Sequence, residues 1–208
     1  MLFRSLAPGA VDLWLADLDD AAGERLERLL RADERERAAR ILAPPTRRRW
    51  VTARGLLRRL LGEYLAADPR ALELTTGAHG KPALARTQLE FNLSHSGSLA
   101  LYAFARANPV GVDIELADRR NIGAIAERLG AGAAGLVGVS REQQQRELLR
   151  SWVRREALAK CSGLGIRRSC AQSAPAAWVK QLELGDTAVG ALAARQEPLE
   201  LRCRRLRV

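Results

Sequence analysis

The feature that most constrains the fold is a change of hydrophobic period along the chain. Between about residues 46 and 66, apolar and aromatic side chains recur at helical spacing. They are Trp50, Ala53, Leu57, Leu60, Leu61 and Tyr64. Three strand-length apolar segments follow, at residues 89–93, 99–105 and 110–116. A chain that changes period in this way predicts an α+β fold.

The rest of the sequence extends this mixed pattern. A strand is expected at residues 11–15, and charged helical sequence follows from about 20 to 42, where Asp33 and Glu36 resemble a capping box for its second half. Pro44-Pro45 ends that helix. The remaining expected elements are a helix at 122–129, a Gly-rich loop at 130–138, a helix from Ser140 to about Cys161, and strands near 178–184, 188–193 and 199–208.

The two halves of the chain repeat the same order of elements. Shifted by 102 positions, Trp50-Val51 overlays Trp152-Val153, and Arg54 overlays Glu156. The identities are few, and chance stays an alternative explanation. The order of elements predicts a pseudo-twofold duplication of two similar lobes, residues 1–105 and 106–208, with the active site between them.

Composition narrows the classes of protein that the chain can represent. A content of 47% hydrophobic residues excludes a wholly disordered chain, and 4% aromatic residues disfavour an RNA module built on base stacking. Three cysteines without CxxC spacing argue against disulfides or zinc, and no apolar run could span a bilayer or serve as a signal peptide, so we expect a cytoplasmic protein. The net charge of +10 predicts a polyanionic partner.

The acidic pair in GVDIE is the sharpest local signal for chemistry. Asp113 and Glu115 alternate on a predicted strand, so both carboxylates lie on one face. Oxygen ligands without His or Cys favour Mg²⁺, which completes its shell with water and substrate phosphate. The alternative is an ordinary strand with an acidic outer face.

A helical row follows at a spacing of four residues. Trp152, Glu156 and Lys160 stack along one helix face. Glu156 could be a third acid beside the cation or a base, and Lys160 could hold a phosphate. The alternative is a surface ion pair, although the tryptophan at the head of the row favours a face that meets protein.

Other polar and basic residues are further candidates. FNLSHSG places Ser94 and His95 in a predicted polar turn one strand before the acidic pair, and a structural corner is the alternative. In GAHGKP, Lys81 is a candidate phosphate contact on a Gly/Pro turn. Most arginines of the basic clusters at residues 35–54 and 202–207 are expected on the surface, and a minority that faces the cleft would be enough to bind several phosphates.

Taken in order, these segments resemble a known family. GKPAL, FNLSHSG, GVDIE and WVRREALAKCSGLGI, preceded by DERERAARILAPPTRRRWVTARGLL, are similar to the broad-acceptor, Sfp-like 4′-phosphopantetheinyl transferases. The resemblance covers roughly residues 10–168. It implies a monomeric, pseudo-twofold α+β enzyme that transfers the phosphopantetheine arm of coenzyme A to a serine of an acyl or peptidyl carrier protein and releases 3′,5′-adenosine bisphosphate. Such enzymes serve fatty-acid, polyketide and nonribosomal-peptide synthesis.

The resemblance also implies roles for individual residues. Asp113, Glu115 and Glu156 would hold Mg²⁺, or Mn²⁺, against the coenzyme A pyrophosphate, with Lys160 facing that group. Glu156 would take the serine proton, directly or through a metal-bound water. The nucleotide phosphates would be contacted by Lys81, Ser94 and His95, with His95 at the 3′-phosphate, and by the basic set Arg37, Arg49 and Arg54.

Two features depart from the family pattern, and two other functions stay open. Arg155 stands where the family commonly has Lys, and residues 130–139 are unusually rich in Gly and Ala near the expected carrier-docking surface. The main alternative is a non-catalytic basic protein that binds nucleic acid or an acidic partner. A relative that binds coenzyme A without turnover is a second alternative.

Overall fold

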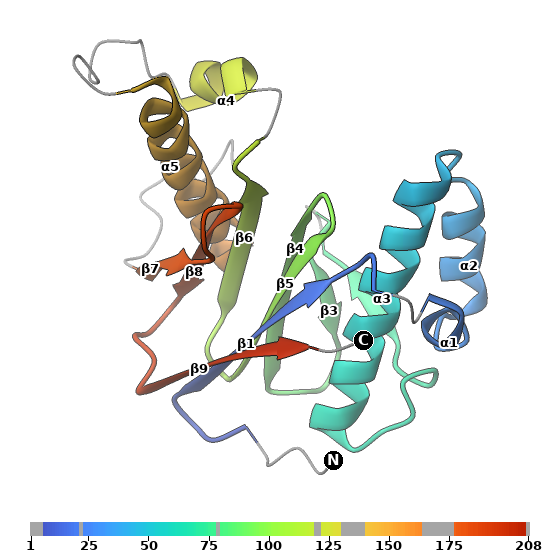
Figure 1. Ribbon diagram of the computed structural model, residues 1–208. Helices are drawn as coiled ribbons and strands as arrows, with labels where there is room; N and C mark the ends of the chain where they lie inside the picture. Colours follow the sequence, from blue (N-terminus) through green and yellow to red (C-terminus); the bar gives the residue numbers. More distant parts are fainter. Residues whose placement is uncertain are drawn as a thin grey trace.

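The computed structural model describes residues 6–20, 23–77, 80–118, 122–129, 140–163 and 177–206. These residues form a mixed α+β structure with three sheets and two 22-residue helices that lie on different sheets (Figure 1). The α+β class expected from the sequence is confirmed. In the described part of the chain, no helix combines the length and the apolar character that crossing a membrane would require.

The first sheet has four strands in the order β4-β5-β1-β9. Its strands are β1 (Ala10–Asp17), β4 (Leu89–Ser96), β5 (Leu99–Arg106) and β9 (Glu200–Leu206). Neighbouring strands run antiparallel except for β1 and β9, which are parallel. A strand near the end of the chain therefore completes a sheet that the first strand begins.

Helix α3 (Pro44–Leu65) covers one face of this sheet. Its stripe packs Leu57, Leu60 and Leu61 against Trp14 and Phe104, all at most 6% exposed. Two shorter helices, α1 (Gly23–Glu27) and α2 (Ala32–Ala39), lie beside α3. The small hairpin of β2 (Leu74–Thr76) and β3 (Pro82–Leu84) follows α3.

The second half of the chain builds a three-stranded sheet in the order β6-β8-β7. Its strands are β6 (Val110–Leu116), β7 (Trp178–Glu183) and β8 (Ala188–Ala194). Helix α5 (Arg141–Ser162) packs on one face, and α4 (Ile122–Leu129) lies beside it. The opposite face, which includes Val112 and Ile114, packs against β1 and β5, so an apolar core joins the two larger sheets.

The bounds of most elements expected from the sequence agree with the structure to within a few residues. For α5, local chemistry explains this agreement. Ser140 caps its first turn by accepting a hydrogen bond from the Gln143 amide at 3.2 Å, as the sequence predicted. Gly163 ends the helix with φ of 71°, a left-handed conformation that suits glycine. The Gly-rich stretch 130–139 lies outside the described residues.

Other expectations were wrong. The charged helical stretch forms two helices, and the second, α2, begins at Ala32, where the Glu34 carboxylate accepts from the Arg31 amide at 3.0 Å. The capping box expected at Asp33 and Glu36 is therefore displaced by two residues. FNLSHSG, expected to turn after Leu93, continues as strand β4 to Ser96. The duplication of two lobes and the division at residues 105 and 106 stay predictions.

Candidate active site

Strand β4 meets strand β6 through polar side chains instead of a backbone ladder. Alternate residues of β4 face β6, because side chains two apart lie on the same side of a strand. Each of them forms a hydrogen bond to β6 at 2.7–2.9 Å. Ser94 Oγ donates to Asp113 Oδ1, Ser96 Oγ donates to Glu115 Oε2, and Asn92 Oδ1 accepts from the Val112 amide. This contact orients both acids of the GVDIE segment.

Asp113 is the centre of a compact polar cluster. Its side chain is 6% exposed, and Lys160 Nζ lies 2.7 Å from Oδ1. The same ammonium donates to Ser94 Oγ at 3.0 Å, so one charge contacts both groups. Asp113 Oδ2 is buried and has no hydrogen-bond partner among the described residues. The structure thus brings Asp113, Ser94 and Lys160 together, and their roles toward a ligand stay predictions.

A glycine makes the approach of α5 to β6 possible. A Cβ on Gly111 would lie 2.1 Å from the Ala157 carbonyl oxygen and 2.3 Å from the Cys161 amide nitrogen. Because real Cβ atoms do not approach backbone so closely, only glycine allows the helix to pack at this depth. The close approach carries Lys160 to the acidic strand.

The remaining acids lie on two different elements, β6 and α5. Glu115 is 8% exposed, beside Ser96, while Glu156 is half-buried on α5, one turn before Lys160. Within the described part of the chain, no three His, Cys, Asp or Glu side chains form a group that could hold a metal ion. The expected convergence of Asp113, Glu115 and Glu156 on one cation therefore stays a prediction.

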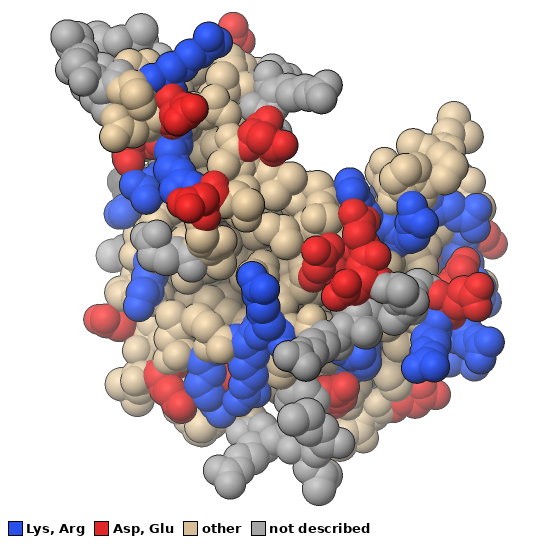
Figure 2. All heavy atoms as spheres, in the orientation of Figure 1, with Lys and Arg blue, Asp and Glu red and all other residues tan. Residues whose placement is uncertain are grey.

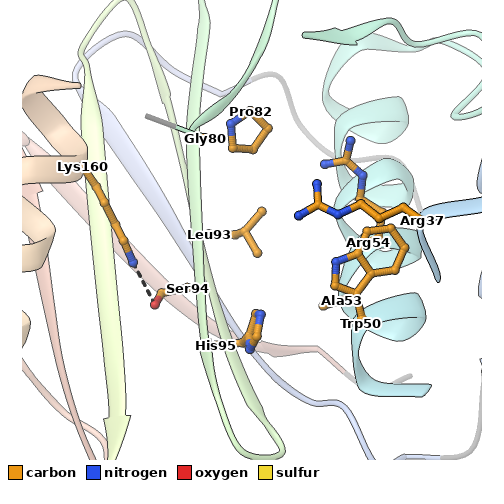
Figure 3. Close-up of a pocket in the computed structure, with 10 residues that line it drawn as sticks. All are labelled: Arg37, Trp50, Ala53, Arg54, Gly80, Pro82, Leu93, Ser94, His95 and Lys160. Carbon is orange, nitrogen blue, oxygen red and sulfur yellow. Dashed lines mark hydrogen bonds between the residues drawn. The ribbon is translucent and has the colours of Figure 1, made fainter. Parts of the chain in front are cut away.

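A pocket of about 380 Å³ opens beside this cluster (Figure 3). Lys160 and Ser94 lie at one side, and the guanidinium groups of Arg37 and Arg54 lie at the other. Between them the wall is partly apolar. Its other lining residues are Trp50, Ala53, Gly80, Pro82, Leu93 and His95. Cations at both sides of a partly apolar pocket suit a ligand with two separated anionic groups.

Two contacts hold the basic side of the pocket. The Arg37 guanidinium lies over the Trp50 ring, 5.6 Å from its centroid, which is within the range of a cation–π interaction. Arg54 Nε donates to Glu34 Oε1 at 2.5 Å. The surface view shows further basic side chains around α2 and α3 and in the area of β9 (Figure 2).

His95 faces the pocket, and its ring is in an environment that disfavours protonation. Although His95 is exposed to solvent, partial desolvation of its ring by the surrounding protein lowers the pKa of the imidazole below its ordinary value of 6.5, and the charge of Lys160 lowers it further. The free protein therefore holds the neutral form of His95 over a wider pH range than an unfolded chain would. An anion beside the ring would oppose this shift.

Two of the candidate cations have partners elsewhere. Lys81 Nζ donates to the Val110 carbonyl at 3.0 Å, and burial lowers the pKa of its ammonium. Arg49 forms a two-point ion pair with Asp19, at 2.8 and 2.6 Å. Neither side chain lines the pocket in this structure. Their contacts with a ligand stay predictions.

Sequence reasoning missed several residues that shape the site. It treated Trp50 only as part of an apolar stripe, and it assigned no role to Asn92, Ser96 or Glu34. The alternation of polar residues in FNLSHS was the signal for Asn92 and Ser96, because a strand, unlike a turn, would aim them at the same neighbour. No sequence signal paired Glu34 with Arg54.

Comparison with known proteins identifies the family to which the chain is related. A family model described as 4′-phosphopantetheinyl transferase, N-terminal, matches residues 21–106. The 4′-phosphopantetheinyl transferase HetI of Nostoc sp. is 35% identical over 173 residues, which cover 79% of this chain and 73% of HetI. The chain belongs to the 4′-phosphopantetheinyl transferases.

Other relatives of this transferase agree with that membership. A putative 4′-phosphopantetheinyl transferase of Synechocystis sp. is 29% identical over 169 residues, with 78% of this chain and 69% of the relative covered. AcpT of Escherichia coli, also a 4′-phosphopantetheinyl transferase, is 36% identical over 124 residues, with 57% and 60% covered. The Sfp-like resemblance is confirmed, and the protein is an enzyme that modifies carrier proteins. The family implies coenzyme A and carrier proteins as substrates, together with Mg²⁺.

Proposed function

We propose that this transferase binds coenzyme A across the pocket, with the pyrophosphate beside Lys160 and Asp113 and the 3′-phosphate towards Arg37, Arg54 and His95. The observation that carries the proposal is the cluster of Asp113, Lys160 and Ser94 at one side of a pocket whose other side is basic. A phosphate near Lys160 would gain a charge-assisted hydrogen bond. The partly apolar wall between the two sides suits the adenosine.

The donor chemistry at β6 fits a magnesium ion. Asp113 Oδ2 is a buried carboxylate oxygen with no hydrogen-bond partner among the described residues, and such an atom is stabilised by a cation. Asp113, Glu115 and Glu156 would be the protein ligands, with Mn²⁺ as an alternative ion. When bound, the ion would supply charge neutralisation on the pyrophosphate oxygens.

The reaction needs an attacking serine, a base and charge stabilisation. The carrier serine oxygen forms a bond to the phosphorus of the pantetheine phosphate, and the bond from that phosphorus to the bridging oxygen breaks. The serine proton passes to Glu156 or to a water next to it, and 3′,5′-adenosine bisphosphate leaves with the electron pair. Lys160 would stabilise the charge that develops on the leaving phosphate.

The acceptor is proposed to be an acidic acyl or peptidyl carrier protein. The net charge of +10 supports this choice, since opposite charge speeds diffusional encounter. The transferase is proposed to act as a cytoplasmic monomer, and the free thiols of Cys161 and Cys203 fit a reducing compartment.

The two-lobe duplication belongs to the same proposal. It is supported by the two 22-residue helices, α3 and α5, each of which packs on the sheet of its own half. The pocket draws residues from both, Arg54 from α3 and Lys160 from α5. A site between similar lobes would receive one wall from each.

The first test is transfer to a carrier. Incubated with coenzyme A, Mg²⁺ and an apo carrier protein, the wild type should add the phosphopantetheine mass to the carrier, as read by mass spectrometry. Asp113→Ala should lower turnover by about 10²-fold or more while the circular-dichroism melt shows a folded protein, because one group that stabilises transition-state charge is worth that much. Glu200→Ala, which removes an exposed carboxylate on β9, is the matched control.

Two results would reject the proposal. Retained transfer by folded Asp113→Ala would remove that carboxylate from the site. Salt-sensitive retention of DNA by the wild type without any gain of carrier mass would favour the alternative of a basic binding protein.

A further inference from the structure

Glu34 is a buried acid between two arginines of α3. It is 4% exposed, on α2, and each of its oxygens accepts one guanidinium hydrogen bond. Arg54 Nε donates to Oε1 and Arg58 Nε donates to Oε2, both at 2.5 Å. The Arg31 amide adds a hydrogen bond to Oε2 at 3.0 Å. One carboxylate thus fixes two cations that differ in their surroundings.

Arg58 is buried and binds backbone carbonyl groups of the protein interior. Its side chain is 1% exposed, and Nη1 donates to the carbonyls of Pro69 and Leu72 at 2.6 and 3.1 Å. These contacts tie the chain that follows α3 to the middle of that helix. Arg58 does not line the pocket.

Arg54 has a different environment, although it shares the same carboxylate. Its side chain is 20% exposed and lines the pocket, where the close-up shows the guanidinium beside that of Arg37 (Figure 3). Only its Nε is used by Glu34, and no described residue accepts a hydrogen bond from its Nη atoms. The ion pair therefore fixes the guanidinium plane and leaves its terminal nitrogens for a ligand.

The Glu34 carboxylate keeps its negative charge in the folded protein. Burial of the Glu34 carboxyl raises its pKa, but hydrogen bonds from Arg58 and the Arg31 amide, with the charge of Arg54, outweigh burial and hold the pKa below the ordinary value. One carboxylate between two guanidinium groups leaves a net positive charge at the pocket wall. A fixed cation of this kind loses little freedom when it binds an anion.

We propose that Glu34 is a positioning residue, which fixes Arg54 at the side of the pocket opposite Lys160 so that the Nη atoms of Arg54 bind the 3′-phosphate of coenzyme A. The proposal rests on the proposed function, because it requires the pyrophosphate at the Lys160 side. The 3′-phosphate is the other anionic group of coenzyme A, and the ribose separates it from the pyrophosphate. Glu34 itself touches no substrate.

The test compares coenzyme A with 3′-dephospho-coenzyme A in the transfer assay. Glu34→Gln should raise the KM for coenzyme A about tenfold, since a hydrogen bond to a charged group is worth about one such factor. The kcat and the KM for 3′-dephospho-coenzyme A should stay within about twofold of the wild type. Arg54→Met should have the same effect, and the double variant should add nothing further. Glu34→Asp, which keeps the charge, should restore part of the selectivity.

Arg58→Lys is the matched control, because it perturbs the same carboxylate from the interior. It should lower thermal stability and leave the ratio of the two KM values unchanged. If Glu34→Gln does not fold, Glu34→Asp carries the test, and a smaller loss of selectivity in the same direction is expected. Equal losses for both substrates, or losses by Glu34→Gln and Arg54→Met that multiply in the double variant, would overturn the positioning role.

The test separates this inference from the proposed function. If Arg54→Met selectively raises the KM for coenzyme A but folded Glu34→Gln does not, the pocket assignment stands and the role of Glu34 fails. If Arg54→Met, Arg37→Ala and His95→Ala all leave that KM unchanged, coenzyme A binds elsewhere and both proposals fail.

Discussion

At the scale of single residues, the site depends on partners that restrict each charge. Asp113 is held by Ser94 and Lys160, and Arg54 is held by Glu34. Side chains fixed in this way can stabilise developing charge without reorganising during the reaction. His95 is the exception, because its environment disfavours its charged form in the absence of ligand.

That environment predicts how His95 affects stability as pH changes. The pKa of its imidazole is lowered on folding, so the unfolded chain takes up a proton near pH 6.5 that the folded protein resists. Stability conferred by neutral His95 is therefore present above pH 6.5 and is lost as pH falls through the lower, folded-state pKa. His95→Gln should remove this loss. In urea denaturation between pH 8 and pH 5.5, the wild type should lose more free energy of unfolding than the variant.

The His95→Gln variant is a suitable reference for the wild type, because glutamine keeps the polarity of the position but does not titrate in this range. Parallel pH profiles for the two proteins would show that the imidazole pKa is not lowered by folding.

At the scale of elements, the contact between α5 and β6 determines where Lys160 lies. Gly111 allows the helix backbone to reach the strand, and the same helix is fixed at its start by Ser140 and Gln143. A displacement of α5 would move Lys160 away from Asp113 without altering either side chain. Positioning at this level affects catalysis strongly, because small misplacements of reacting groups are costly.

Gly111→Ala should therefore impair both stability and turnover. The added methyl group would overlap the Ala157 carbonyl and the Cys161 amide, and overpacking of this kind costs about 1–3 kcal/mol in free energy of unfolding. The shift of Lys160 should lower kcat by about 10- to 100-fold. Chemical denaturation and the carrier assay measure the two effects.

Gly123→Ala on α4 is the matched control, because a Cβ there meets no atom within 4 Å. It should change the free energy of unfolding by no more than about 0.5 kcal/mol. A Gly111→Ala protein as stable and active as Gly123→Ala would contradict the close contact.

Elements of this kind were largely predictable from sequence, and contacts between them were not. The stripe of α3 and the alternation of β6 are local patterns, so periodicity located both elements and grouped Asp113 with Glu115. The pairing of Ser94 with Asp113 depends on two strands of different sheets, and sequence reasoning placed them only in the same cleft. Lys81 and Arg49 were proposed as ligand contacts because of their charge, but their partners in the structure, Val110 and Asp19, were beyond a local pattern.

At the scale of the whole molecule, β9 links the end of the described chain to its beginning. Arg202 Nε lies 2.9 Å from Asp12 Oδ1, and Asp12 is 2% exposed. Tyr64 of α3 donates to Asp12 Oδ2 at 2.6 Å, so β1, β9 and α3 meet at one carboxylate. This network explains why a strand from the second half can be stable in the sheet of the first.

Arg202→Met should weaken that link. Removing one partner of a fully buried ion pair costs about 3–5 kcal/mol, and because Arg202 is 21% exposed we expect a loss on the order of 2–3 kcal/mol. The KM for coenzyme A should not change, since Arg202 does not line the pocket. Arg205→Met, an exposed position on the same strand, is the control, and an equal loss of stability in both variants would argue against the buried network.

The parallel pairing of β1 with β9 also affects how the protein is made. About 190 residues separate the two strands, so the ribosome must synthesise nearly all of the described chain before β1 gains its second neighbour. Until then, one edge of β1 lacks its neighbouring strand, and Asp12 lacks its ion-pair partner Arg202. The first sheet is therefore expected to close only after translation of β9, and the nascent chain should depend on chaperones for longer than a protein whose sheets form from adjacent strands.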